Sequence, residues 1–314
     1  MAQVDIIIPV YETPIKFLKK TIQSVINQSI TDWEVLIVDD SSSKRYQELL
    51  KSVLKTYSDK RLNLIFNNTR MGAPGARNIG IKNSSADYIA FLDSDDLWYP
   101  QKLEEQLSLF KIFNTSLVCS NMVTIDEKEI ILSKKHKDPS SKYNDYTNKK
   151  RLLSLIKKNW VKTSTVMVKK RVLERIGNFD EKLKSCQDWD LWIRFAIAKE
   201  PIYCSDNNLT LYRKRSQSIS TNYDLVLASR LSVLDKTIPK VNLIYNGLIN
   251  ETMMCALKRN TYLSSASKYY HLGDFHKAKL LVKKSFKFGI VYRGLSRYLK
   301  CILFEPFKSF IINH

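Results

Sequence analysis

Residues 88–100 read YIAFLDSDDLWYP, an apolar run that ends in three carboxylates within four residues. The run at 88–92 is short, aromatic and aliphatic, which is typical of a buried strand. Asp93, Asp95 and Asp96 follow it directly. Neighbouring carboxylates repel one another, so this turn needs a cation or hydrogen-bond donors to stabilise it. The stretch therefore predicts a strand whose end carries a functional site.

Three more apolar runs precede this stretch, at residues 4–10 (VDIIIPV), 33–38 (WEVLIV) and 62–66 (LNLIF). Segments with helical character lie at 15–26 and 74–82, and another follows at 100–113. The alternation predicts an α/β fold with a mostly parallel central sheet and helices on both faces. Ligands of such sheets bind beyond the carboxyl ends of the strands. Tyr11, Asp39, Asp40 and the acidic turn all lie at such ends, so they form one candidate site.

The positive charge is unevenly distributed along the chain. The net charge is +20, yet residues 134–171 hold 13 basic and two acidic side chains, and residues 225–314 hold 15 and four. Residues 134–150 are polar without periodicity and predict a loop, whereas helical patterns dominate from 225 onward. The two basic segments suit either nucleic acid or an anionic membrane surface.

The sequence predicts a cytoplasmic protein. No window approaches the ~20 apolar residues of a membrane span. The N-terminus MAQVDIIIPV lacks a basic leader, and the five cysteines are scattered without a C-x-x-C pair. These features argue against secretion, a disulfide framework and structural zinc.

Carboxylates in a compact turn are the ligands that Mg²⁺ and Mn²⁺ prefer. Magnesium usually takes one or two carboxylates and completes its shell with substrate phosphates. The acidic turn therefore suggests a nucleoside diphosphate bridged through Mn²⁺ or Mg²⁺. The chain has neither a G-x-x-x-x-G-K-[ST] loop nor a G-x-G-x-x-G turn after a strand, which argues against P-loop hydrolysis and hydride transfer.

The motifs follow the order IIIPVYE, IVDDSS, NTRMGAPGARNIGI, ADYIAFLDSDD and QDWDLWIRF. This order resembles the family 2 glycosyltransferases with a GT-A fold over roughly residues 4–220. The resemblance implies a GT-A domain at 1–224, with a nucleotide-binding half at about 1–115 and an acceptor half at about 116–224. A helical, basic C-terminal extension would follow at 225–314.

The resemblance also implies roles for individual residues. Asp95 would hold the metal, with Asp93 near the ribose and the metal shell, and Asp39 would accept from an N–H of the uracil ring. The expected nucleotide-sugar-binding residues are Pro9, Tyr11, Glu12, Asp39, Asp40, Arg70, Arg77, Asp93, Ser94, Arg213 and Arg215.

The catalytic base of the family lies in a Glu-Asp pair that opens a helix. Here Asp188 matches the base, and Gln187 replaces the usual Glu. Asp190 is expected to support the site or to act as a helix-start acid favoured by the dipole. The Tyr-Arg-x-His segment of the family reads Tyr-Arg-Lys-Arg, so that Arg215 stands where His is usual. An arginine there can grip diphosphate oxygens, but it is not a metal ligand.

These residues predict an inverting, metal-dependent glycosyltransferase that uses a UDP-hexose or UDP-N-acetylhexosamine. A carboxylate base activates an acceptor hydroxyl while a divalent ion and arginine stabilise the leaving diphosphate, so that an α-linked donor gives a β-glycoside. The expected acceptor is a lipid-linked glycan, as in bacterial O-antigen or other surface-polysaccharide assembly.

Two alternatives stay open. A sugar nucleotidyltransferase also places metal-binding acids at strand ends, but residues 11–14 offer no Gly-rich, basic cradle for its phosphates. A nucleic-acid-binding protein would use the basic segments, but it leaves the acidic turn unexplained, and we expect no nucleic acid partner.

The end of the chain, residues 290–314, combines basic residues with aromatic and aliphatic ones at helical spacing. Such a segment suits the interface of an anionic membrane, which would place the protein peripherally on the inner face of the cytoplasmic membrane. The same stripe also suits ordinary packing on the catalytic domain.

Overall fold

The computed structural model describes residues 2–133, 140–216, 218–292 and 294–301. The chain divides into two compact units, Met1–Ser216 and Gln217–His314. The predicted boundary after residue 224 falls inside helix α8 (Tyr223–Ile244) of the second unit.

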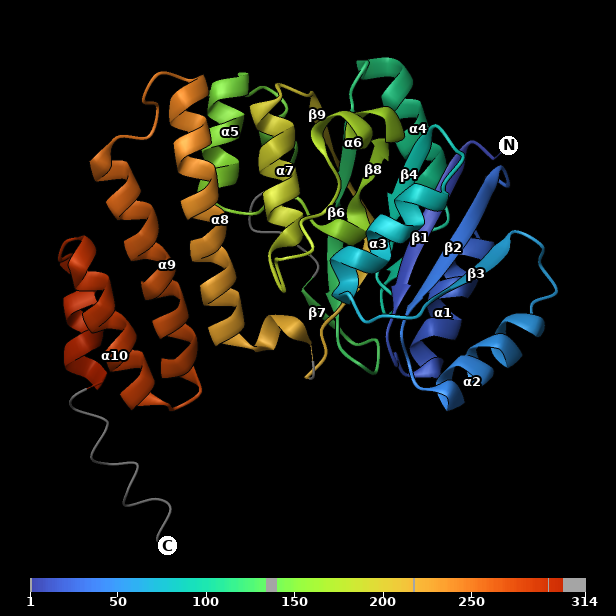
Figure 1. Ribbon diagram of the computed structural model, residues 1–314, viewed down its shortest axis with the longest axis horizontal. Helices are drawn as coiled ribbons and strands as arrows, with labels where there is room; N and C mark the ends of the chain where they lie inside the picture. Colours follow the sequence, from blue (N-terminus) through green and yellow to red (C-terminus); the bar gives the residue numbers. More distant parts are fainter. Residues whose placement is uncertain (1, 134–139, 217, 293, 302–314) are drawn as a thin grey trace, which may run out of the picture. The chain divides into compact units, whose positions relative to one another are not determined.

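Four parallel strands form the first half of the sheet in the order β3-β2-β1-β4 (Figure 1). Their register places Val10 beside Asp39 and Ile7 beside Phe91. The carboxyl ends of β1, β2 and β4 therefore lie at one edge of the sheet, together with the residues that follow them. These strands are β1 (Val4–Val10), β2 (Trp33–Asp40), β3 (Leu62–Asn67) and β4 (Tyr88–Phe91).

The other half of the sheet is mixed, a detail that the apolar runs alone did not predict. Strand β8 (Met167–Lys169) is antiparallel to β4, and β6 (Leu117–Ile125) is antiparallel to β8. Strand β9 (Ile202–Arg213) runs parallel to β6 and pairs antiparallel with β5 (Leu97–Trp98). Because β5 begins directly after Asp96, this pairing brings the end of β9 to the acidic turn. Strand β7 (Ile131–Ser133) pairs with β6 outside this path.

Helices cover both faces of the parallel strands, as the sequence predicts. Side chains of α1 and α4 pack with Ile6 and Ile8, and α3 approaches the opposite face, where a Cβ on Gly80 would lie 2.6 Å from Ile7 Cγ2. Only glycine permits this close approach. The helices are α1 (Ile15–Ile26), α2 (Lys44–Lys55), α3 (Gly72–Asn83), α4 (Lys102–Phe113), α5 (Asn148–Lys157), α6 (Lys170–Ile176) and α7 (Gln187–Ile197), with 3₁₀ turns η1 (Ser140–Tyr143) and η2 (Thr163–Thr165).

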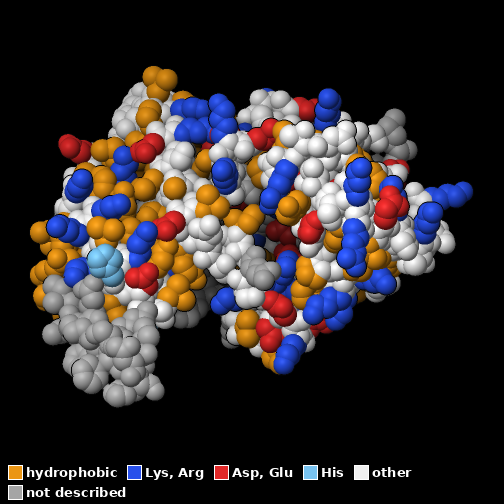
Figure 2. All heavy atoms as spheres, turned by 60° about the horizontal axis from the view of Figure 1, so that its bottom comes forward, with side chains coloured by type: hydrophobic (Ala, Val, Ile, Leu, Met, Phe, Trp, Pro, Cys, Tyr) orange, Lys and Arg blue, Asp and Glu red, His pale blue; other side chains and the backbone are white. Residues whose placement is uncertain are grey.

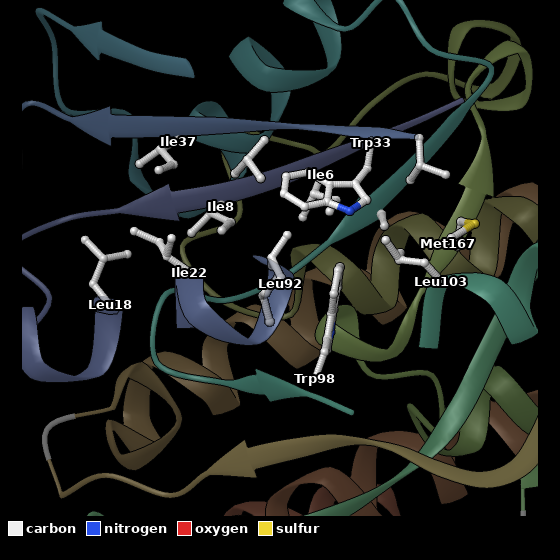
Figure 3. Close-up of a cluster of buried hydrophobic side chains, with 14 of the residues drawn as sticks. Ile6, Ile8, Leu18, Ile22, Trp33, Ile37, Leu92, Trp98, Leu103 and Met167 are labelled. Atoms are coloured by element: carbon white, nitrogen blue, oxygen red, sulfur yellow. The ribbon is translucent and has the colours of Figure 1, made fainter. Parts of the chain in front are cut away.

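A continuous core joins these elements (Figure 3). Leu18 and Ile22 of α1 point toward Ile8, and Trp98 lies beneath Leu92, the last apolar residue before the acidic turn. Burial of each such side chain is worth ~1.5–3 kcal/mol. The strand end that presents the acidic turn is thus anchored in this core.

The second unit is helical, with a small core of its own around Leu263, Ala266, Leu281 and Val282. Asparagine or aspartate side chains cap the three main helices, because Asn222, Asn250 and Asp274 each accept a hydrogen bond from a first-turn backbone N–H. Besides η3 (Ile219–Thr221), the helices are α8, α9 (Glu251–His271), α10 (Phe275–Ser285) and η4 (Phe286–Phe288). Residues 302–314 of the predicted membrane-interface segment lie outside the described residues.

Candidate active site

The three carboxylates of the acidic turn are stabilised in two ways, by hydrogen bonds inside the fold and by ion pairs. Asp96 is completely buried, and its Oδ1 and Oδ2 accept from Arg213 N (2.8 Å) and Ser164 Oγ (2.6 Å). Burial, together with the nearby Asp95 and Asp93, raises the pKa of Asp96 well above the ordinary value. Asp96 therefore belongs to the folded framework of the turn and is not available to a ligand.

Asp93 and Asp95 instead pair with arginines. Arg77 Nη2 lies 2.5 Å from Asp93 Oδ1, and Arg215 Nη1 lies 3.0 Å from Asp95 Oδ2. The Asp93 and Asp95 side chains keep 34% and 23% of their exposure, so both carboxylates are reachable. Burial and the charge of Asp93 raise the pKa of Asp95, while Arg215 opposes this shift.

The structure corrects the predicted role of Arg213. Its guanidinium is fully buried, with Nε donating to Asp95 O (2.8 Å) and Nη2 pairing with Glu129 Oε1 (2.9 Å). Phe17 covers it at 4.6 Å. Because these contacts occupy the guanidinium, Arg213 holds the backbone of the acidic turn, and Arg215 is the one that faces the carboxylates.

The ends of β1 and β2 form a second part of the site. Pro9 is buried beside Val38, and Tyr11 is 42% exposed with Arg70 stacked 3.8 Å over its ring. Asp39 is fully buried, and its Oδ2 accepts from Gln47 Nε2 (2.9 Å) and Ser42 N (3.2 Å).

The other oxygen of Asp39, Oδ1, has no hydrogen-bond partner among the described residues. Buried carboxylate oxygens are normally satisfied. Asp39 Oδ1 is therefore suited to accept a hydrogen bond from a ligand N–H, such as that of a nucleobase.

Three predicted donor-binding residues also have hydrogen-bond partners within the chain. Asp40 accepts from Met71 N (2.9 Å) and Gly72 N (2.7 Å), which fixes the start of α3. Ser94 Oγ shares a 2.6 Å hydrogen bond with Thr13 Oγ1. The exposed Glu12 accepts from Ser43 N (3.0 Å), and this bond lowers the pKa of Glu12. These contacts connect the loops that surround the site.

Asp188 lies in the first turn of α7 with its carboxylate oriented by neighbours. Its Oδ2 accepts from Asn159 Nδ2 (2.9 Å) and, over 3.4 Å, from Thr163 Oγ1, and its Oδ1 accepts from Trp189 N (2.8 Å). Asp188 remains partly exposed. An oriented, ionisable carboxylate that solvent can reach has the properties of a general base.

The two residues beside Asp188 differ from each other. Gln187 Oε1 is buried without a partner among the described residues. Asp190 is buried and pairs with Arg194 at 2.9 Å, and Arg194 in turn donates to the carbonyls of Ile176 and Asn178. Asp190 therefore stabilises the loop before α7.

The short turn η2 connects the two halves of the site. Thr163 contacts Asp188, while Ser164 Oγ donates to Asp96 and accepts from Asp93 N (3.1 Å). Consecutive residues thus place the candidate base beside the acidic turn. Sequence reasoning missed Asn159, Thr163, Ser164 and Glu129, because polar and charged residues in irregular segments carry no periodic signal.

The site fits a divalent ion only in part. No group of three or more His, Cys, Asp or Glu side chains able to hold a metal occurs among the described residues. Asp93 and Asp95 supply the one or two carboxylates that Mg²⁺ or Mn²⁺ usually takes when substrate phosphates complete the shell. Figure 2, which brings the lower edge of Figure 1 forward, shows a hollow with acidic side chains inside and basic side chains near it.

Comparison with known proteins identifies the class to which this fold and site belong. Residues 5–177 match the family described as Glycosyl transferase family 2. The match covers more than half of the chain, so the chain belongs to this family.

Two relatives and one solved structure extend this result. An uncharacterized glycosyltransferase of Methanocaldococcus jannaschii is 33% identical over 61% of this chain and 63% of its own length. The Escherichia coli UDP-Glc:alpha-D-GlcNAc-diphosphoundecaprenol beta-1,3-glucosyltransferase WfgD is 38% identical over 41% of this chain and 49% of its own. The chain thus spans less than two thirds of either relative.

The mannosyltransferase PcManGT of Pyrobaculum calidifontis, solved with GDP-Man and Mn²⁺, superposes with a TM-score of 0.60 at 15% identity, covering 98% of this chain and 83% of that one. At this identity the likeness shows the fold alone. The predicted α/β GT-A fold with C-terminal helices is confirmed.

Proposed function

We propose that the protein transfers a hexose or N-acetylhexosamine from a UDP-sugar to a hydroxyl of a lipid-linked glycan, with inversion to a β-linkage. The observation that carries this proposal is the η2 bridge, which sets the Asp188 carboxylate beside the acidic turn. Single displacement at an anomeric carbon requires a base and a stabilised leaving group on opposite sides of the sugar.

Asp188 acts as the base in this proposal. Its carboxylate takes the proton of the acceptor hydroxyl as the oxygen attacks the anomeric carbon. Asn159, Thr163 and the backbone N–H of Trp189 hold the carboxylate in one orientation before the acceptor arrives. Such a base contributes ~10²–10⁴-fold to the rate.

Asp95 and Asp93 would hold a divalent ion. When bound, Mn²⁺ or Mg²⁺ supplies positive charge to the diphosphate that leaves. Arg215 adds hydrogen bonds to the same oxygens, since a guanidinium binds phosphate through two parallel N–H groups. Arg77 and Asp96 stabilise the conformation of the acidic turn through the ion pair with Asp93 and the hydrogen bond from Arg213 N.

The nucleotide would lie against the ends of β1 and β2. The free Oδ1 of Asp39 suits the N–H of uracil, and the Tyr11 and Arg70 pair offers a flat surface for the base or ribose. The name of the relative WfgD includes a UDP-glucose donor. The PcManGT structure holds GDP-mannose, so a guanine nucleotide is the alternative that the donor screen must test.

A lipid-linked acceptor would lie at a membrane, and the second unit exposes apolar side chains that suit contact with one. The name of WfgD specifies a diphosphoundecaprenol-linked acceptor. No helix among the described residues is long and apolar enough to cross a bilayer. Yet Ile290, Tyr292, Leu295 and Leu299 expose 67, 87, 44 and 51% of their surface, and Figure 2 shows apolar side chains mixed with Lys and Arg on the helical unit. We propose that the part of the chain that contains these four residues lies on an anionic membrane surface, where lipid-linked acceptors are found.

A donor screen tests the proposed reaction. Purified protein with Mn²⁺ or Mg²⁺ is offered UDP-glucose, UDP-galactose, their N-acetylhexosamine analogues and GDP-mannose, and the release of nucleoside diphosphate is measured. The proposal expects release of UDP from at least one UDP-sugar. Release of pyrophosphate from a nucleoside triphosphate and a sugar phosphate would instead establish a nucleotidyltransferase. GDP release alone would refute the uracil assignment.

A further inference from the structure

Every carboxylate of the acidic turn is already satisfied by the chain itself. Asp93 pairs with Arg77, Asp95 pairs with Arg215, and Asp96 accepts two hydrogen bonds. The positive charge that this turn requires is therefore present without a metal ion. A divalent ion at Asp93 or Asp95 must compete with an arginine for the carboxylate.

The two arginines differ in how readily they can leave. The Arg77 side chain is 5% exposed and lies 5.4 Å from the Phe179 ring, inside the fold. The Arg215 side chain is 19% exposed, makes one contact at 3.0 Å with Asp95, and has Phe17 beside it at 5.5 Å. Arg215 is thus the arginine that can change partners without unfolding the site.

Electrostatics links the metal to the donor. A divalent ion at Asp95 would lie within a few ångströms of the Arg215 charge, and the two repel strongly in a partly buried site. A diphosphate removes this repulsion, because its oxygens bind both the ion and the guanidinium. Metal binding therefore becomes favourable only when the diphosphate arrives.

We propose that Arg215 is a counter-ion that exchanges partners: it neutralises Asp95 in the donor-free protein and moves to the donor diphosphate when the metal binds. This inference rests on the proposed function, in that the diphosphate is that of the donor. Its consequence is that the metal and the nucleotide bind with positive coupling, and coupling between two ligands is reciprocal. A free protein would hold Mn²⁺ weakly, and UDP would create the tight site.

Binding measurements test this inference without any turnover. Mn²⁺ binding to the full chain is followed by electron paramagnetic resonance of the free ion and by calorimetry, with and without UDP. Wild-type protein is expected to bind Mn²⁺ ~10-fold or more tightly in the presence of UDP, within the usual range of coupling between sites. Equal Mn²⁺ affinity with and without UDP would overturn the inference, whatever the variants do.

The variant Arg215→Gln removes the competing charge and keeps a polar side chain of similar reach. Without UDP, this variant is expected to bind Mn²⁺ ~5-fold or more tightly than wild type, and its gain from UDP is expected to shrink correspondingly. Mn²⁺ affinity unchanged from wild type in the absence of UDP would contradict the exchange. Arg215→Lys keeps the charge and is expected to retain the weak metal site.

Lys214→Gln is the matched control, since it removes the adjacent exposed charge while Lys214 N keeps its bond to Ile125 O. The Mn²⁺ affinity of Lys214→Gln is expected to equal that of wild type. If the affinity rose equally in Lys214→Gln and Arg215→Gln, the effect would come from the lower net positive charge alone, and the inference would be overturned. The comparison of Mn²⁺ binding by wild type and the variants without UDP does not depend on sugar transfer. A donor screen without turnover, together with the predicted shift in Arg215→Gln, would refute the proposed function and leave the exchange standing.

Discussion

Thr163 and Ser164 are consecutive residues whose hydroxyls contact different carboxylates: Thr163 Oγ1 lies 3.4 Å from Asp188, and Ser164 Oγ lies 2.6 Å from Asp96. Two neighbouring residues of the chain therefore contact Asp188 on one side and the acidic turn on the other. The turn that contains them, η2, precedes β8, which pairs with β4 next to the acidic turn. The antiparallel insertion of β8 into the sheet therefore brings Asp188, the proposed base, close to the acidic turn.

Asp188→Asn tests the base. The amide keeps the shape of the side chain and its contact with Trp189 N but cannot take a proton, so we expect turnover to fall by ~10²-fold or more while UDP-sugar affinity stays unchanged. Steady-state kinetics and calorimetric donor binding measure the two quantities. Turnover within a factor of about three of wild type would assign the base elsewhere, and loss of donor binding as well would indicate a structural role. Asp87→Asn, at an exposed site, is the control.

Asp95→Ala tests the metal site. Without this carboxylate the divalent ion loses its main protein ligand, so we expect turnover to fall below detection, and an excess of chelator should do the same to wild type. Melting temperature controls for folding, because Asp95→Ala also removes the ion pair with Arg215. Full activity in chelator would rule out a metal-dependent reaction.

The pKa of Asp96 predicts a pH dependence of stability. The folded-state pKa is raised well above that of the unfolded chain, so the folded state binds more protons as the pH falls. Wild-type protein should therefore gain stability relative to Asp96→Asn as the pH drops through the folded-state pKa, and the gain should be complete below about pH 4.

Denaturant unfolding of both proteins at several pH values measures this difference. The gain of wild type relative to Asp96→Asn is expected to grow as the pH falls through the folded-state pKa, because burial raises the pKa of Asp96. A difference that is independent of pH would mean that Asp96 is ionised in the fold as readily as in the unfolded chain.

The second unit predicts reversible membrane attachment. Flotation with anionic vesicles should recover the protein at low salt, with recovery falling at high salt and with neutral vesicles. The triple variant Tyr292→Ser, Leu295→Ser, Leu299→Ser should lose most binding, whereas Leu243→Ser with Ile244→Ser, which removes equally exposed apolar residues elsewhere in this unit, should retain it. An intact protein that ignores anionic vesicles at low salt would show that the segment serves packing.

Much of this arrangement could be predicted from the sequence, because the signals are local. Apolar runs followed directly by acids mark strand ends, and a parallel sheet brings such ends together, which placed Asp39 and Asp93 at one edge. The pairing of β8 with β4 depends on long-range contacts, so the sequence did not reveal it. Helix α5 was not predicted, because Leu152, Leu155 and Ile156 provide only one apolar face in a basic segment.

The different positions of Arg213 and Arg215 could not be predicted from the local sequence. Both follow the same strand region, and both residue types suit a diphosphate. What distinguishes them is the position of Glu129, more than 80 residues away in the chain, which pairs with Arg213 and leaves Arg215 at the acidic turn. No spacing within the motif contains that information.

The stereochemistry of the first product tests the account most directly. Time-resolved ¹H NMR of a UDP-α-sugar that the protein turns over identifies the anomer that forms first, even when water replaces the natural acceptor. Direct displacement by a nucleophile that Asp188 activates predicts that UDP and the β-anomer appear together, and that Asp188→Asn slows both equally. Initial formation of the α-anomer would contradict the account.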